Sequence, residues 1–280
     1  MTSRCDYHID QLMSNPQRKP VDLCSANGFC IWHGPCKLQG QPRALRPWDF
    51  AMHHHVHTPS QAQPGTVADL AATRPHSVAV LQRYGIDFCC GGGRPLDQAC
   101  AVAAVSVAQL LAEVAEREAF GKDERRWDQA PLPELVAYIV DHHHQPLADE
   151  LTRLQAMAAR VLKVHGPKDP ERLAELYETV LALETDLIPH LRKEEDVLFP
   201  LIIAGRPLDA GEAVQALRLE HDGVATLLTR ARELTDHYVP PDHACMTWRA
   251  LFNGLSELEA DLKRHIHLEN NILFPRALMA

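Results

Sequence analysis

Two stretches of the sequence decide the fold: residues 190–200, HLRKEEDVLFP, and residues 265–275, HIHLENNILFP. Each stretch holds a histidine, a glutamate four residues later, and then Leu-Phe-Pro, and the two copies lie 75 residues apart. Residues four apart lie one turn apart on the same face of a helix. The spacing therefore predicts two helices, each presenting an imidazole and a carboxylate in one direction.

The sequence around both stretches is helical in pattern from Leu132 to the end of the chain. Breakers such as Gly166-Pro167, Gly205-Arg206-Pro207 and Pro240-Pro241 divide it into four long segments. The expected helices cover residues 132–164, 169–203, 210–237 and 243–278. Four long helices with short connections predict an all-α fold, an antiparallel four-helix bundle over residues 130–280.

The remaining two helices each contribute a lone histidine, His144 and His221, which lie 46 and 44 residues before the His-xxx-Glu pairs. The bundle therefore reads as an internal duplication, which places four imidazoles and two carboxylates around one interior point. The expected metal ligands are His144, His190, Glu194, His221, His265 and Glu269. Imidazoles with carboxylates able to bridge favour a dinuclear site for iron, with manganese next, whereas zinc more often takes a closed tetrahedral set.

Surface ion pairs between His and Glu are the alternative for these motifs. They are disfavoured because Leu187, Leu191 and Ile266 lie on or beside the same helix faces, and buried polar groups need a compensating partner. Two more carboxylates, Asp186 and Glu220, are predicted to orient ligands or pass protons. The other clustered histidines are expected at the surface: His142, His143 and His267.

Ahead of the bundle, residues 65–122 predict a small helical domain that contains Cys89-Cys90-Gly91-Gly92. Adjacent cysteines strain a disulfide between them, so a reactive dithiol is expected, able to take iron, a nitrosyl group or a mixed disulfide. The alternative is two buried cysteines that end a helix. Because the thiols and the metal ligands lie on different domains, transfer between them requires docking. Cys100 and Cys245 are expected to be structural.

Composition excludes several classes of protein. The 280 residues carry a net charge of −9, and 46% of them are hydrophobic, which argues against a disordered chain and a general nucleic-acid binder. No apolar run approaches the ~20 residues that span a bilayer, and the start lacks the apolar stretch of a signal peptide. A cytoplasmic protein that binds no membrane is expected. Residues 1–64 lack periodicity and predict a poorly ordered extension.

Two features of the chain resemble a known family. The six expected ligands are similar to the set of hemerythrin-like proteins. Residues 84–92, YGIDFCCGG, look like the short N-terminal domain of the di-iron proteins for repair of iron centres (the RIC family, YtfE/ScdA type). The resemblance covers residues 66–280. The chain departs from the family's pattern at Gly93, where a lysine is often found, at Pro189 beside a ligand, and in the extension.

The resemblance implies a function: restoring iron-sulfur clusters damaged by nitric oxide or peroxide, with two non-haem irons in the bundle. It implies that Glu194 and Glu269 bridge the irons, that two histidines cap each iron, and that His165 lies near the cavity. The expected partners are damaged iron-sulfur proteins, with nitric oxide or peroxide as small ligands, and the protein is expected to be a monomer or homodimer. A nitric oxide or peroxide reductase and a hemerythrin-like oxygen or iron sensor stay open as alternatives.

Overall fold

The computed structural model describes residues 65–122 and 124–279. These residues belong to one compact unit and form helices joined by short connections, with a single isolated bridge between Thr66 and Pro95 in place of any strand. The all-α prediction is confirmed for the described ranges. The predicted extension, residues 1–64, lies outside the described residues.

The small N-terminal part contains four short helices, whose ends follow from local sequence signals. They are α1 (Val67–Thr73), α2 (Ser77–Arg83), α3 (Leu96–Val102) and α4 (Val107–Phe120). Thr66 and Asp69 form a capping box at the start of α1, and the Ser106 hydroxyl accepts from a backbone N–H in the first turn of α4. Gly85 ends the turn after α2 with a φ of 67°, a conformation that costs glycine little.

The C-terminal part is a four-helix bundle in which three of the four long helices are interrupted. The first runs through α5 (Leu132–Ile139), η1 (Val140–His144) and α6 (Gln145–His165), and a short turn, η2 (Gly166–Lys168), follows it. The second runs through α7 (Pro170–Lys193), η3 (Glu194–Leu198) and α8 (Phe199–Ile203). The third is α9 (Pro207–Leu234), and the fourth runs through α10 (Met246–His267), η4 (Leu268–Leu273) and α11 (Phe274–Met279).

The interruptions η1, η3 and η4 are π-helical turns, and each ends shortly before a proline: Pro146, Pro200 and Pro275. A proline inside an α-helix lacks an N–H, and its ring clashes with the carbonyl four residues back. A wider π turn relieves this conflict and is frequent at functional sites. Each π turn also contains a predicted ligand, namely His144, Glu194 and Glu269.

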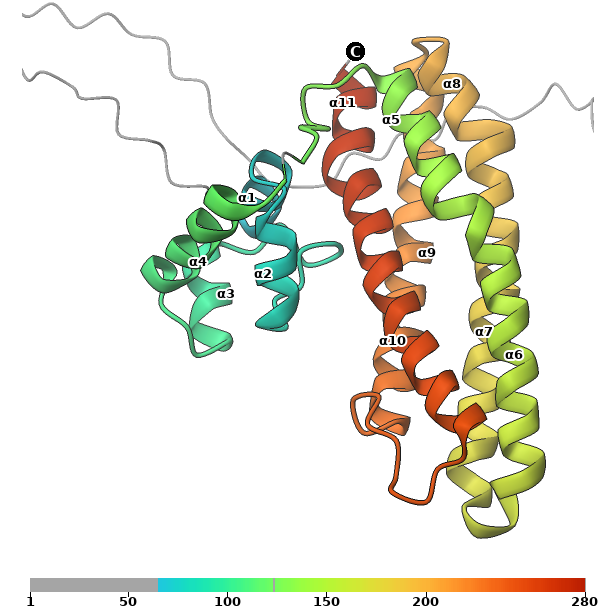
Figure 1. Ribbon diagram of the computed structural model, residues 1–280. Coiled ribbons are helices and arrows are strands. Elements are labelled where there is room, and N and C mark those ends of the chain that lie inside the picture. The colour runs from blue at the N-terminus through green and yellow to red at the C-terminus, as the bar shows by residue number, and fades with distance from the viewer. Residues whose placement is uncertain (1–64, 123, 280) are drawn as a thin grey trace, which may run out of the picture. The chain divides into compact units, whose positions relative to one another are not determined.

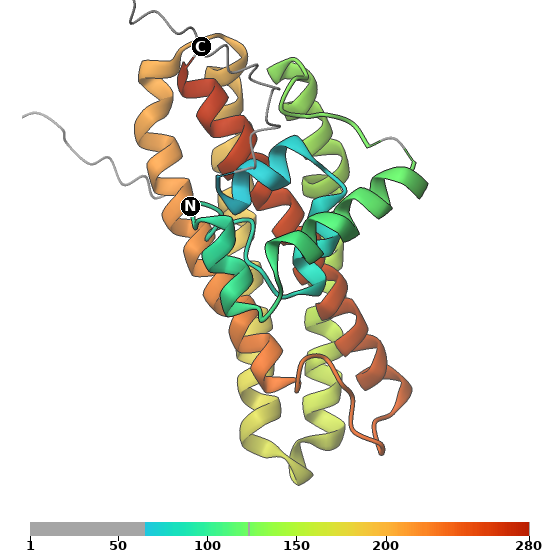
Figure 2. The same cartoon turned by 90° about the vertical axis from the view of Figure 1, so that its left-hand side faces the viewer.

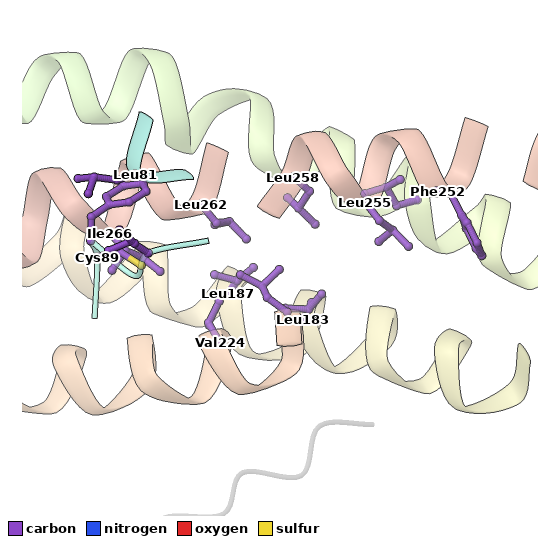
Figure 3. Close-up of a cluster of buried hydrophobic side chains, with 14 of the residues drawn as sticks. Leu81, Cys89, Leu183, Leu187, Val224, Phe252, Leu255, Leu258, Leu262 and Ile266 are labelled. Carbon is purple, nitrogen blue, oxygen red and sulfur yellow. The ribbon is translucent and has the colours of Figure 1, made fainter. Parts of the chain in front are cut away.

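The long helices α6, α7, α9 and α10 lie side by side in both ribbon views (Figures 1 and 2) and pack on one another as a closed bundle. Leucines fill its interior, including Leu183, Leu187, Leu258 and Leu262 (Figure 3). Each fully buried leucine contributes roughly 1.5–3 kcal/mol to folding. Cys89 from the small helical part belongs to the same buried cluster.

Among the described residues, no single helix has the length and apolar character needed to cross a membrane. Helices α3 and α4 pass that test only when taken together, and they are bent by 100° at the break between them.

Candidate metal centre

The structure brings all six predicted ligands together in the interior of the bundle. Their side chains are almost completely buried, with exposed fractions between 0% and 3%. They form two groups whose ligand atoms all lie within 4.8 Å of one another. The first half-site consists of His144 and His265 with both glutamates, and the second half-site of His190 and His221 with the same two glutamates, Glu194 and Glu269.

In each half-site the two imidazoles face each other through their Nε2 atoms. These atoms are 2.9 Å apart between His144 and His265. They are 3.1 Å apart between His190 and His221. The Glu269 carboxylate lies between the half-sites, with Oε1 3.0 Å from His265 Nε2 and Oε2 3.3 Å from His221 Nε2. Two metal ions that shared the carboxylates would fit this arrangement.

In the second half-site, the outer nitrogen of each imidazole has an acceptor. His190 Nδ1 lies 2.9 Å from a Glu220 carboxylate oxygen, and His221 Nδ1 lies 3.0 Å from the Asn270 side-chain oxygen. Each Nδ1 therefore carries the proton in the neutral ring, and both Nε2 lone pairs point inward. Lone pairs that face each other at 3.1 Å repel unless a cation lies between them. Burial lowers the pKa of His190 to about 4, which keeps this ring neutral, as a metal ligand must be.

The two buried carboxylates also call for a cation. Both oxygens of Glu194 and Oε2 of Glu269 lack a hydrogen-bond partner. Burial, followed by the facing Glu269 charge, raises the pKa of Glu194 well above its usual range. Burial also favours a raised pKa for Glu269. The nearby imidazoles outweigh it, with His265 contributing most, and hold the pKa of Glu269 well below its usual range. Without metal, one carboxyl retains a proton; with cations present, both can ionise.

The first half-site is held less completely. His144 Nδ1 lies 2.8 Å from Glu195 Oε1, and although burial opposes it, hydrogen bonds with Glu269 and Glu195 raise the pKa of His144. His265 Nδ1 is buried and has no hydrogen-bond partner. Instead, the ring of His143 stacks on His265, with centroids 5.4 Å apart and planes 5° apart.

Two predicted supporting residues lie elsewhere. His165 was expected near the cavity, but it ends α6, 21 residues long, whose other end adjoins His144. At 1.5 Å per residue this puts it about 30 Å from the site. Asp186 is exposed on α7, because Glu220 from α9 already occupies the outer side of His190. Both predictions were wrong in position, whereas Glu220 lies where it was predicted.

Two of the three histidines expected at the surface are buried. His143 is 5% exposed and pairs with Asp261, with 3.0 Å between Nδ1 and Oδ2. His267 is 3% exposed, contacts the Asn271 side chain, and has its pKa lowered to about 4 by burial. Only His142 is exposed, as expected.

Sequence reasoning missed two residues that hold ligands, Glu195 and Asn270. A signal for both was present, because each directly follows a His-xxx-Glu glutamate at the same point of the repeat. In the structure each one contacts the lone histidine of the neighbouring helix, His144 or His221.

The cysteine pair is docked against the second half-site. Cys90 Sγ lies 3.9 Å from the backbone oxygen of His221, and the Asn271 amide donates to the Phe88 carbonyl at 2.8 Å. The two thiols differ: Cys89 is buried, and contact with Cys90 together with burial raises its pKa, whereas Cys90 is half-buried. The small helical part therefore contacts the bundle beside the second half-site, the arrangement that transfer between the thiols and the metal ligands would require. The other two cysteines also differ, because Cys100 is buried and Cys245 is exposed, contrary to the structural role expected of Cys245.

Comparison with known proteins agrees with the bundle and its site. Residues 135–277 match the hemerythrin HHE cation binding domain, and residues 64–118 match ScdA_N, a domain of unknown function (DUF542). The buried His/Glu groups, which share Glu194 and Glu269, are consistent with the di-iron centre of that class. The chain is 40% identical over 215 residues to the iron-sulfur cluster repair protein YtfE of Musicola paradisiaca, covering 76% of this chain and 96% of the relative. It is 41% identical over 214 residues to that of Edwardsiella ictaluri, with the same coverage. The chain belongs to the YtfE family of iron-sulfur cluster repair proteins.

Proposed function

We propose that this protein repairs iron-sulfur clusters damaged by nitrosative or oxidative stress, by iron donation or nitric oxide handling at a carboxylate-bridged di-iron centre. The observation that carries the proposal is the pair of buried His/Glu groups sharing two glutamates. The relatives named iron-sulfur cluster repair proteins align with it along 96% of their length. Its clients are then proteins that hold iron-sulfur clusters.

In this proposal the four histidines and two glutamates bind the irons, with Glu194 and Glu269 shared between them. The bound pair would supply one-electron chemistry and exchangeable iron. The protein supplies the orientation: Glu220 and Asn270 fix the rings of the second half-site, with their Nε2 atoms directed inward. Buried apolar side chains, among them Phe199 against His144 and Phe274 against His221, keep bulk water away from the carboxylates.

The first half-site is the one from which we propose iron leaves. His265 has no partner at Nδ1, so its ring is free to carry the proton on Nε2 and donate it to Glu269, 3.0 Å away. That state gives His265 Nε2 and Glu269 Oε1 a hydrogen bond to each other without a metal ion. The second half-site has no equivalent state, because Glu220 and Asn270 hold both protons on the outer nitrogens.

The cysteine pair is proposed to serve the exchange with the client. A cavity of about 520 Å³ opens beside Cys89 and Cys90 and is also lined by Arg218, Asp222 and Asn270. Of the two thiols, Cys90 is the accessible one and contacts the backbone of His221. Thiolates are soft ligands that take iron or a nitrosyl group.

The experiment begins with anaerobic purification and measurement of iron per chain. Two irons are expected in the natural protein, and almost none after Glu194→Ala with Glu269→Ala. The loaded protein is then mixed with a [4Fe–4S] protein that has been damaged by nitric oxide. Recovery of the client's activity, with loss of iron from the donor, supports repair. Sustained consumption of nitric oxide with an electron donor would favour a reductase, and a reversible oxygen adduct would favour a sensor.

A further inference from the structure

A chain of aromatic rings leads from the first half-site towards the surface of the protein. The ring of His143, in η1, lies parallel to that of the ligand His265, with centroids 5.4 Å apart and planes 5° apart. The ring of Tyr138, in α5, meets His143 edge-on, with centroids 5.8 Å apart. Trp127, in the segment before α5, packs on Tyr138 with centroids 4.3 Å apart. Because Tyr138 and Trp127 are only half-buried, the chain reaches solvent within two rings of His143.

The other three ligand rings have no such connection to the surface within the described residues. Outside the set of ligands, His144 contacts the ring of Phe199, with centroids 5.6 Å apart, and His221 contacts that of Phe274, with centroids 6.1 Å apart. Both phenylalanines are buried, and neither contacts a further ring. His190 contacts the ring of His221 alone. The chain is therefore a feature of one ligand only.

The two outer members of the chain are the aromatic residues that lose an electron most readily, whereas phenylalanine does not. When a tyrosine loses an electron it also loses its phenol proton. The hydroxyl of Tyr138 makes no hydrogen bond with another described residue and is not sealed from solvent. A cavity of about 450 Å³ is lined by Tyr138 together with Trp127, Glu124 and Arg264. The phenol proton can therefore leave into this cavity, while the electron leaves towards His143.

Reduction of hydrogen peroxide to water takes two electrons, and a centre with only one iron(II) can supply one of them. We propose that Tyr138 supplies the other through the stacked rings of His143 and His265, an inference that rests on the di-iron centre proposed above. Hydrogen peroxide is the oxidant: its O–O bond breaks, and both oxygens become water by taking the phenol proton and one proton from solvent. The iron(II) is oxidised to iron(III), and Tyr138 is oxidised to a neutral tyrosyl radical. Trp127 then returns an electron and a proton to Tyr138, which moves the radical away from the ligands.

The test uses the full-length, iron-loaded protein, with iron per chain counted on every sample. Its centre is brought to the state with one iron(II) and one iron(III), mixed with hydrogen peroxide without oxygen, and frozen at set times. Electron paramagnetic resonance then detects radicals and distinguishes tyrosyl from tryptophanyl signals. We expect a tyrosyl radical in the natural protein and loss of most of that signal in Tyr138→Phe. This variant keeps the ring and loses only the hydroxyl, so its iron content should not change.

Three further variants separate the roles of the neighbours. Trp127→Phe should leave the yield of the tyrosyl radical unchanged and lengthen its lifetime several-fold, because the next electron donor is missing. Tyr177→Phe is the matched control, since Tyr177 is a half-buried tyrosine on α7 that contacts no other ring of the described chain. His142→Gln removes a ring that stacks on Tyr138, with centroids 4.1 Å apart, but does not lie on the path to His265. Both controls should change neither the yield nor the lifetime.

Either of two results would overturn the proposal. One is oxidation of the iron(II) by peroxide in the natural protein with no tyrosyl radical at any time. The other is a tyrosyl signal of equal size in the natural protein and in Tyr138→Phe. The iron count separates these failures from failure of the di-iron assignment, because they leave two irons per chain, whereas a wrong assignment leaves none.

Discussion

The two half-sites of the metal centre are built from repeated sequence, yet only one is fully supported from outside. In the second half-site, Glu220 directly precedes the lone histidine His221 and holds the outer nitrogen of His190. In the first half-site, His143 stands at the same place before His144. The ring of His143 stacks on His265, and Nδ1 of His265 is left without a hydrogen-bond partner. One residue in the layer around the ligands thus makes two similar half-sites unequal.

A second pair of repeated residues, two aspartates, also differs between the half-sites, and the difference follows from the presence of Glu220 in one and His143 in the other. Asp186 and Asp261 each lie four residues before a ligand histidine, His190 and His265. Asp261 pairs with His143, whereas Asp186 is exposed, since a carboxylate beside Glu220 would meet a like charge. The duplicated ligands fix where metal binds, and we expect the surrounding residues to decide how tightly each ion is held.

The largest effect is expected when two single variants are compared, each of which lacks one histidine of a different half-site. His221→Ala should lose both irons, because it opens the half-site that cannot satisfy itself without a cation. His265→Ala should keep the iron of the second half-site. Iron per chain, measured after anaerobic desalting, checks this. Equal losses in the two variants would contradict the inequality of the half-sites.

The next test concerns the acceptors around the second half-site. Asn270→Ala removes the oxygen that holds His221 Nδ1, and we expect iron affinity to fall about 10- to 100-fold. Asn271→Ala is the matched control, because it loses a bond to the Phe88 carbonyl but no contact with a ligand. Competition with a graded series of chelators measures both. An equal effect of the two changes would mean that domain docking, not ring orientation, is what matters.

The fold and the six ligands could be predicted because a repeat constrains both at once: the same spacing fixes helix faces and partner positions. His165 was misplaced because its position near the cavity came from the family resemblance alone, whereas the helix predicted over residues 132–164 already separates it from His144 by about six turns. His143 and His267 were assigned to the surface because adjacent histidines look alike in sequence. Which of them is buried depends on the π turn in η1 and on the docking of the small domain, which no periodicity of 3.6 encodes.

A smaller effect is expected in the pH dependence of stability of the metal-free protein, in which the two shared carboxylates have no cation beside them. The pKa of Glu194 is raised by burial and by Glu269 in the metal-free protein. Such a carboxyl stabilises the fold while protonated, and this contribution is lost as the pH rises through its folded pKa. Relative to Glu194→Gln, the metal-free protein should therefore lose on the order of 1 kcal/mol or more of unfolding free energy between about pH 5 and pH 8. Thermal melts across this range measure it, and a constant difference between the two proteins would argue against the assignment.

The smallest effect is expected on the rate of iron release when the first half-site is given a carboxylate that corresponds to Glu220 in the second. His143→Glu places a carboxylate where the second half-site has Glu220, within reach of a ring that now has no partner at Nδ1. It also puts a like charge near Asp261, so Asp261→Asn is added to relieve the repulsion. We expect the double variant to release its first iron more slowly, by a few-fold to about tenfold. Stopped-flow release to a coloured chelator measures the two phases.

Asp261→Asn alone is the control for this variant, because it frees His143 without giving His265 an acceptor. It should leave the first phase unchanged or make it faster. If the double variant slows the second phase instead, the labile ion would be the one at His190 and His221. In the expected case, where the first phase slows, repair of the client by the double variant should slow by the same factor, since the iron that leaves first is the iron that can be donated.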